Sequence, residues 1–460
     1  MSSGTPVVIL KKRSDEEPAF AAGAATHADS PRLGLVPLSY HLLMAAPVPS
    51  TVLTFEDARR AVEEQAAQVP PPATESVDLL SAIGRVVAET VLSDRDLPPF
   101  PRSTRDGYAL RSDDLQQLPA NLIVIGEIRA GEKLEKIPRI SQGQAVSIMT
   151  GAPVPEGADA VVMVEYTEPD GERVAIARNV TTGENIVPRG AEAKQGSPLL
   201  NRGMRLNDAA IALAATAGKS RLMVYRRPRI AVLATGDEIV DVSAVPGPTQ
   251  IRNSNSYSLA AQVREAGGEP DLLAVAPDEP QALRRLIEQG LESDLLLLTG
   301  GVSMGRYDLV EQVLAELHAE FFFTGAKIQP GRPVVFGKCG AGVAGRDAPK
   351  YFFGLPGNPV STMVTSELFA RPVLEALAGQ SPRKLRFLHA RLKSEIRVKA
   401  GLRRFLPAVL SGEFDDSQVE LVPWQGSGDI AATARANCYI VVAPDCERIA
   451  AGEWVGIMMR

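Results

Sequence analysis

Apolar runs alternate with amphipathic stretches in the second half of the chain. Unbroken apolar runs, typical of strands buried on both faces, occur at 229–235 (RIAVLAT), 294–301 (DLLLLTGG) and 351–357 (YFFGLPG). The stretches between them space their apolar residues as helices do, as in PQALRRLIEQGL at 280–291. This strand, helix, strand rhythm predicts a mainly parallel, doubly wound α/β domain over residues 228–380.

The loop within LLLLTGGVSMGRYD, 295–308, carries two successive glycines, Gly300 and Gly301. A helix is predicted from Tyr307 to His318, so this loop connects a strand to a helix. In parallel α/β sheets such loops lie at the carboxyl edge, where the free N–H groups of a helix start attract anions. The loop is therefore a candidate phosphate or oxyanion site, and an ordinary tight turn is the alternative.

A different pattern precedes this domain. Thr54 caps a predicted helix, and a second helical stretch is expected over 70–89. Short β-like pieces separated by Gly, Pro and Asp follow, and helical signal returns between Asn207, as a cap, and Gly218, as a stop. We therefore expect a discontinuous N-terminal helical domain formed by 51–116 and 199–227, with a β-rich domain inserted at 117–198.

The two ends of the chain differ in composition. Residues 381–460 contain alternating strands and predict a small β-barrel or sandwich. The first fifty residues are rich in Ala, Ser and Pro and lack the pattern of a secretion signal, so 1–50 predict a disordered N-terminal extension. Met44 is an alternative start, because the helix capped by Thr54 follows it closely.

Length and composition set the class of protein. At 460 residues the chain suggests three or four domains, and its 45% hydrophobic and 23% charged residues are those of a soluble globular protein. No apolar run approaches the roughly eighteen residues of a membrane helix, and the net charge of -6 argues against a protein that coats nucleic acid. The three cysteines lack metal-site spacing, which favours a reducing compartment.

Acidic side chains follow several of the predicted strands. Glu238, Asp278 and Asp308 should meet at one edge of the sheet, beside Ser303 and the LPGNPVS loop. Clustered acids next to anion-binding loops suggest Mg²⁺ bridging protein and phosphate, although for each acid alone a turn or helix cap is the favoured explanation. Between these loops, KIQPGRP adds two cations, Lys327 and Arg332, that could bind an oxyanion or simply face solvent.

Two further polar loops precede the α/β domain. STRDGYA places Asp106 before a glycine, and SIMTGAPVPEGADAVVM places Thr150 before a turn rich in Gly and Pro. Either loop could be turn chemistry alone.

Taken together, these segments resemble the molybdopterin molybdenumtransferases, the molybdenum insertases that include the E domain of gephyrin. The resemblance covers about residues 50 to 460 and rests on DGYA, IMTGAPVPEGADAVVM, GENIVPRGAE, ATGDEI, TGGVSMGRYD, QPGRP and LPGNPVS in that order. It implies a molybdopterin-binding α/β domain, an inserted β-domain, a discontinuous first domain and a C-terminal β-barrel over 381–460. It also implies a cytoplasmic homodimer, with no nucleic-acid or membrane partner.

The resemblance further implies the reaction and its residues. The substrates would be adenylylated molybdopterin and molybdate, the products AMP and the molybdenum cofactor, and Mg²⁺ would assist. In the homodimer, Asp106, Thr150 and Glu192 would complete the site of the second subunit. The implied catalytic residues are Asp106, Thr150, Glu192, Glu238, Asp278 and Asp308, the implied substrate-binding residues are Gly300, Gly301, Ser303, Lys327, Arg332, Pro356, Gly357, Asn358, Pro359 and Ser361, and the implied metal ligands are Glu238 and Asp308.

Two alternatives stay open at this point. An adenylylating enzyme of the same pathway would use a similar α/β domain to transfer AMP from ATP, although the extra domains argue against it. A non-catalytic dimeric scaffold is the other, and the acids at 106, 238, 278 and 308 argue against that one. The sequence does not distinguish molybdate from tungstate, or identify the enzyme that receives the cofactor.

Overall fold

A computed structural model describes residues 8–9, 50–301, 309–340, 349–381 and 383–460. The chain divides into two compact units, which are taken separately below. The first unit contains residues 1–73 and 226–460, and the second contains residues 74–225. The predicted site residues Ser303 and Asp308 lie outside the described residues.

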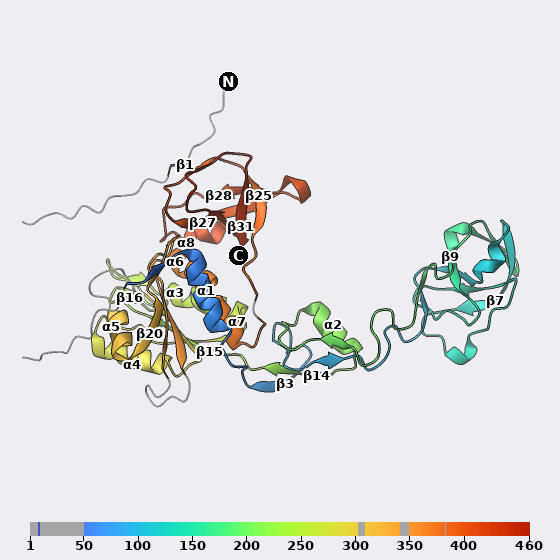
Figure 1. The fold of residues 1–460 in the computed structure, drawn as a ribbon, viewed down its shortest axis with the longest axis horizontal. Helices are drawn as coiled ribbons and strands as arrows, with labels where there is room; N and C mark the ends of the chain where they lie inside the picture. The colour runs from blue at the N-terminus through green and yellow to red at the C-terminus, as the bar shows by residue number, and fades with distance from the viewer. Residues whose placement is uncertain (1–7, 10–49, 302–308, 341–348, 382) are drawn as a thin grey trace, which may run out of the picture. The chain divides into compact units, whose positions relative to one another are not determined.

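A six-stranded sheet organises the first unit (Figure 1). Its first four strands are parallel, and the last two run antiparallel to their neighbours. The mainly parallel sheet predicted from the apolar runs is therefore confirmed. The strand order is β18 (Glu269–Leu272), β15 (Arg229–Ala234), β19 (Leu295–Thr299), β24 (Lys350–Leu355), β23 (Val335–Cys339) and β20 (Ala319–Phe323).

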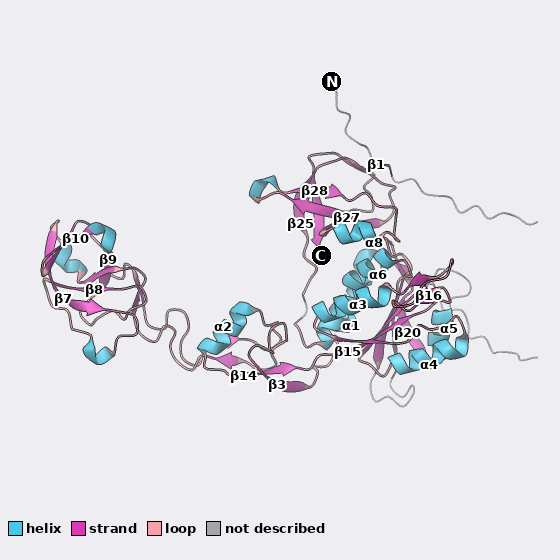
Figure 2. Cartoon of the chain, turned by 180° about the vertical axis from the view of Figure 1, so that it is seen from behind, coloured by secondary structure: helices cyan, strands magenta, loops and turns pink. Residues whose placement is uncertain are grey.

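Helices cover both faces of this sheet (Figure 2). Successive strand residues point to opposite faces, so Val232 packs in one core and its neighbours Ala231 and Leu233 pack in the other. This alternation explains why the strands are apolar at every position, as expected of a sheet with helices on both faces. One face carries α1 (Phe55–Ala66), α3 (Asn255–Glu265), α6 (Pro359–Thr365), the π-helical turn η5 (Ser366–Ala370) and α7 (Arg371–Leu377), and the other carries α4 (Pro280–Gly290) and α5 (Leu309–Glu316).

Helix α1 begins as predicted but belongs to the α/β core. Thr54 Oγ1 accepts a hydrogen bond from the backbone N–H of Asp57, as expected of the cap. The Phe55 ring lies 6.1 Å from that of Phe369 and 5.5 Å from that of Phe405. This helix was expected to belong to the discontinuous N-terminal domain, whereas its apolar stripe packs against the α/β domain and the barrel. The boundary of that domain stays a prediction.

The C-terminal region forms a closed five-stranded barrel, as predicted. The strands pair in the order β27, β28, β25, β31, β29, and β29 returns to β27. The short strand β1 (Val8–Ile9) pairs in parallel with β26 (Ile396–Arg397), which pairs with β30 (Arg448–Ile449). The barrel elements are β25 (Leu388–Leu392), β27 (Arg403–Ser411), β28 (Gln418–Leu421), α8 (Ile430–Arg435), β29 (Cys438–Val442) and β31 (Trp454–Met459).

The second unit is built around another six-stranded sheet, in the β-rich region predicted. All of its pairings are antiparallel except that of β7 with β8. Its strand order is β10 (Thr167–Asp170), β11 (Arg173–Ile176), β7 (Ala120–Ile128), β8 (Gln144–Ile148), β6 (Gly107–Leu110) and β9 (Ala160–Met163).

The rest of the second unit contains less helix than the sequence predicted. Between 74 and 116 and between 199 and 225 the described α-helix is α2 (Asp208–Thr216), capped by Asn207 as expected. The helix expected over 70–89 is instead β3 (Thr74–Asp78) followed by turns, because β3 pairs with β14 (Arg221–Tyr225) far along the chain. Long-range pairing therefore overrode the local helical spacing. The remaining strands pair as β4 (Val91–Leu92) with β13 (Pro198–Leu200) and β5 (Arg102–Ser103) with β12 (Ile186–Val187).

The two ends of this unit nevertheless share one core. Val87 and Val91 pack with Leu200, Leu206 and Ala214, whereas residues between 108 and 186 fill other cores. This sharing supports a discontinuous region interrupted by the β-rich one, although the predicted domain boundaries stay predictions.

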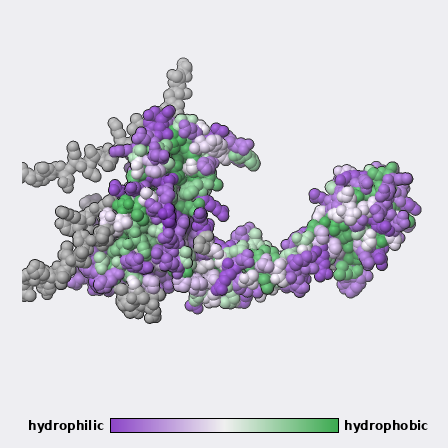
Figure 3. All heavy atoms as spheres, in the orientation of Figure 1, coloured by the Kyte–Doolittle hydropathy of each residue, from purple (hydrophilic) through white to green (hydrophobic). Residues whose placement is uncertain are grey.

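The surface of both units mixes polar and apolar residues on the face shown in Figure 3. Within the described residues, no helix has both the length and the apolar character that crossing a membrane requires.

Candidate active site at the carboxyl edge of the parallel sheet

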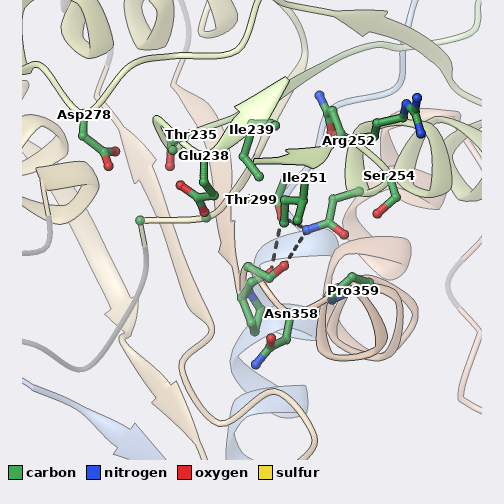
Figure 4. Close-up of a pocket in the computed structure, with 18 of the residues that line it drawn as sticks. Thr235, Glu238, Ile239, Ile251, Arg252, Ser254, Asp278, Thr299, Asn358 and Pro359 are labelled. Carbon is green, nitrogen blue, oxygen red and sulfur yellow. Dashed lines mark hydrogen bonds between the residues drawn. The ribbon is translucent and has the colours of Figure 1, made fainter. Parts of the chain in front are cut away.

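A cavity of about 460 Å³ lies where β15, β19 and β24 end (Figure 4). Parallel strands that end together bring the loops after them to one edge, so residues far apart in sequence line one hollow. The cavity includes half of the predicted site residues, namely Glu238, Asp278, Gly300, Gly301, Pro356, Gly357, Asn358 and Pro359.

The glycines after β19 are required by the backbone. Gly300 has a φ of +92°, and a Cβ added there would lie 2.4 Å from the backbone oxygen of Thr235. Gly301 has a φ of +65°, and its added Cβ would lie 2.9 Å from the hydroxyl of Thr235. The β19 loop therefore passes so close to the end of β15 that only glycine fits without strain.

The loop after β24 approaches the same glycines. A Cβ on Gly357 would lie 3.6 Å from the Cα atom of Gly300, which is ordinary van der Waals contact. Asn358 and Pro359 then open α6 as the cap and first residue predicted, although the Asn358 side chain makes no capping hydrogen bond. Two loops thus form adjoining walls of the cavity.

Acidic residues gather after β15 and β18. The backbone N–H of Asp278 donates to Asp237 Oδ1 over 3.1 Å. Burial, and then the negative charges of Asp237 and Glu238, raise the pKa of the Asp278 carboxyl above its ordinary value. The Asp278 carboxyl therefore lies within electrostatic reach of two other carboxylates at this edge.

The metal prediction was made for Glu238 and Asp308. The described part of the chain contains no group of three or more His, Cys, Asp or Glu side chains arranged to hold a metal ion. Because Asp308 lies outside that part, the predicted pair stays a prediction.

Three predicted substrate-binding residues do not line the cavity. Lys327 and Arg332 are exposed, and their backbones join neighbouring strands: Lys327 N–H donates to Leu53 O over 2.8 Å. Ser361 lies in α6 and is buried. Their proposed contact with substrate stays a prediction.

Several lining residues were missed from the sequence. Asn253, Ser254 and Asn255 stand at the start of α3 and line the cavity, as do Thr235 and Thr299 at the ends of β15 and β19. The available signal was the polar run RNSNS, which lies directly before an amphipathic helix. The short parallel strands β16 (Ile239–Val240) and β17 (Ile251–Arg252) bring this run to the sheet edge.

The other predicted catalytic residues belong to the second unit. Asp106 Oδ1 accepts hydrogen bonds from the Thr150 backbone N–H at 2.6 Å and from its hydroxyl at 2.9 Å. The backbone N–H, and then the hydroxyl, hold the pKa of the Asp106 carboxyl below its ordinary value. Glu192 forms an ion pair of 2.7 Å with Arg102. The structure therefore brings Asp106 and Thr150 together, on loops that the sequence placed 44 residues apart.

Comparisons with known proteins cover most of the chain. Residues 53–218 match the MoeA N-terminal region (domain I and II), residues 231–376 match a probable molybdopterin binding domain, and residues 389–459 match the MoeA C-terminal region (domain IV).

Relatives and solved structures agree with these matches. The chain is 32% identical to molybdopterin molybdenumtransferase 1 of Mycobacterium tuberculosis, over 86% of this chain and 98% of that one. It is 39% identical to a molybdopterin molybdenumtransferase of a Nostoc species, over 66% of this chain and 70% of that one. A crystal structure of the molybdopterin biosynthesis MoeA protein from Pyrococcus horikoshii aligns with a TM-score of 0.70 and 27% identity, over 89% of this chain and 100% of that one. The chain therefore belongs to the molybdopterin molybdenumtransferase family, enzymes of molybdenum cofactor biosynthesis.

Proposed function

We propose that this enzyme inserts molybdenum from molybdate into adenylylated molybdopterin, releases AMP and yields the molybdenum cofactor. The observation that supports the proposal is the cavity at the carboxyl edge of the parallel sheet, where two glycine-containing loops and an acidic group meet. Loops of this kind suit phosphate, because backbone N–H groups can approach it closely. The proposed setting is the cytoplasm.

The loops after β19 and β24 would hold the phosphate side of the pterin. Breaking the bond between that phosphate and AMP develops negative charge on phosphate oxygens, so positioned charges and donors dominate the expected rate enhancement. Ser303, Lys327, Arg332 and Ser361 are the proposed contacts for molybdate.

Mg²⁺ is the proposed cofactor. The cluster of Asp237, Glu238 and Asp278 fits a divalent cation, because carboxylates are ligands for such ions and the negative charges of Asp237 and Glu238 raise the pKa of Asp278. Glu238 would hold the ion together with Asp308, and the ion would neutralise charge on the phosphates.

A homodimer is the proposed assembly. Asp106, hydrogen-bonded to Thr150, and Glu192 would then act on substrate bound by the second subunit. Light scattering after size exclusion should give twice the mass of one chain.

The experiment that tests the reaction measures AMP release from adenylylated molybdopterin by the purified enzyme with Mg²⁺, with and without molybdate. We expect release that depends on molybdate and leaves molybdenum on the pterin. Glu238→Gln should lower kcat by about a hundredfold, because it removes a charge from the reacting centre. Glu292→Gln, an exposed acid that does not line the cavity, is the matched control and should leave kcat unchanged.

Other outcomes favour other functions. Unchanged turnover of Glu238→Gln would exclude its proposed role. Tight pterin binding without AMP release would favour a scaffold, and AMP transfer from ATP to molybdopterin would favour an adenylylating enzyme.

A further inference from the structure

The side chain of Asn255 connects two loops of the cavity. Asn255 is the first residue of α3, and its Nδ2 donates to Thr299 Oγ1 over 2.9 Å and to the backbone oxygen of Gly357 over 2.7 Å. Figure 4 shows dashed lines for hydrogen bonds beside the labelled Thr299. One amide group therefore bridges the end of β19 and the loop after β24.

Thr299 continues this connection. It is the last residue of β19, is only 2% exposed, and its hydroxyl lies 3.3 Å from the backbone oxygen of Pro356, to which it donates. The bonded residues line the cavity themselves, and so do the residues directly after them, Gly300 on one loop and Asn358 on the other. The bonds thus act immediately beside the two loops rather than at a distance from them.

The hydrogen-bonding partners of the Asn255 amide, namely the Thr299 hydroxyl and the Gly357 backbone oxygen, determine how the amide is oriented. The Gly357 backbone oxygen can only accept a hydrogen bond, so the group of Asn255 that faces it must be the Nδ2 donor. An inverted amide would place Asn255 Oδ1 against that oxygen and would lose the bond to Gly357. The Thr299 hydroxyl could then donate to Oδ1 only by giving up its bond to Pro356 O. Aspartate at this position would likewise bring a carboxylate against a carbonyl oxygen.

We propose that Asn255 and Thr299 form a positioning pair that holds the Gly300 loop and the Gly357 loop at the separation needed to grip substrate. The identity of that substrate, a phosphorylated pterin, rests on the proposed function. Loops fixed before binding lose less conformational entropy when the ligand arrives, so the pair should act on affinity.

Hydrogen exchange of the substrate-free enzyme tests the pair without reference to activity. Asn255→Ala should speed exchange at the backbone amides of Gly357 and Asn358 by about tenfold, since two hydrogen bonds beside the loop are lost. Thr299→Val should speed exchange at Gly300 and Gly301, and Thr299→Ser should keep the wild-type rate. The double variant Asn255→Ala, Thr299→Val should exchange little faster than either single variant.

A matched control comes from the same helix. Gln262 also lies in α3, and its Nε2 donates to a backbone oxygen, that of Met363, over 3.0 Å. Gln262 does not line the cavity. Gln262→Ala should therefore leave exchange at Gly357 and Asn358 unchanged, and equal effects of the two variants would overturn the proposal.

Steady-state kinetics form the second arm. Asn255→Ala should raise the KM for adenylylated molybdopterin by about tenfold and leave kcat within about twofold, and Thr299→Ser should keep the wild-type KM. An unchanged KM in an active Asn255→Ala enzyme would overturn the proposal. A tenfold loss of kcat with an unchanged KM would overturn it as well. Absence of AMP release from the wild type would instead overturn the proposed function, and the exchange experiment would still decide whether the pair holds the loops.

Discussion

At the scale of single residues, the environment of Asp278 departs furthest from that of an ordinary surface acid in the cavity. Its pKa is raised by burial and by the negative charges of Asp237 and Glu238. An acid with a raised folded pKa binds more protons in the folded state than in the unfolded state. Stability therefore falls as pH rises from the ordinary Asp pKa through the folded one.

Because the Asp278 carboxyl lowers stability as the pH rises, removing its charge in Asp278→Asn should stabilise the protein at neutral pH. The variant should raise Tm at pH 7 by about 1 to 2 °C, a small effect because the carboxyl is largely screened by solvent, and should match the wild type near pH 3. Calorimetry at the two pH values measures both. Glu292→Gln is the control and should show no such pH dependence, and an equal gain at both pH values would contradict the electrostatic explanation.

At the scale of elements, the contact between the β19 loop and the end of β15 depends on Gly300. Its φ of +92° and the 2.4 Å separation of an added Cβ from the Thr235 oxygen leave no room for a side chain. Gly357, on the facing loop, lacks a positive φ, and its nearest neighbour to an added Cβ lies at 3.6 Å. The two glycines thus look alike in sequence and differ in what the backbone requires.

Alanine at each glycine tests this difference. Gly300→Ala should lower the free energy of unfolding by about 3 kcal/mol, through backbone strain and the clash with β15. Gly357→Ala, the matched control, should change it by less than about 1 kcal/mol. Urea titration measures both, and equal effects would show that the positive φ and the close approach do not govern stability here.

At the scale of the whole molecule, the hydrophobic cores indicate which regions of the chain need one another in order to fold. The α/β domain, α1 and the barrel share one core, in which Phe55 contacts both Phe369 and Phe405. Among the residues that the structure describes, the cores of 74–225 contain none from outside that range.

Excision of the two regions should therefore give opposite results. Residues 74–225 expressed alone should unfold cooperatively, because their cores are complete. Residues 226–380 alone should bind a hydrophobic dye and aggregate, because they lose Phe55, which contacts Phe369, and Phe405, which belongs to the same core. Thermal melts and dye fluorescence distinguish these results, and a cooperative melt of 226–380 would show that the shared core is not needed.

The sequence by itself determined the elements whose signals are local. Unbroken apolar runs gave β15, β19 and β24, the caps Thr54 and Asn207 gave the starts of α1 and α2, and the motifs at the strand ends located half of the predicted site in one cavity. These features depend on side-chain spacing and hydrogen bonding within a few residues, so the order of residues contains them.

Only the tertiary structure decided what depends on distant partners. The pairing of β3 with β14 replaced an expected helix, and burial against Phe369 and Phe405 assigned α1 to the α/β core. Asn255 emerged as a link between two loops only when its partners at 299 and 357 came within hydrogen-bonding distance. Such contacts join residues 44 to 350 positions apart. Local periodicity cannot predict them, because it contains no information about the free energy gained when distant residues meet.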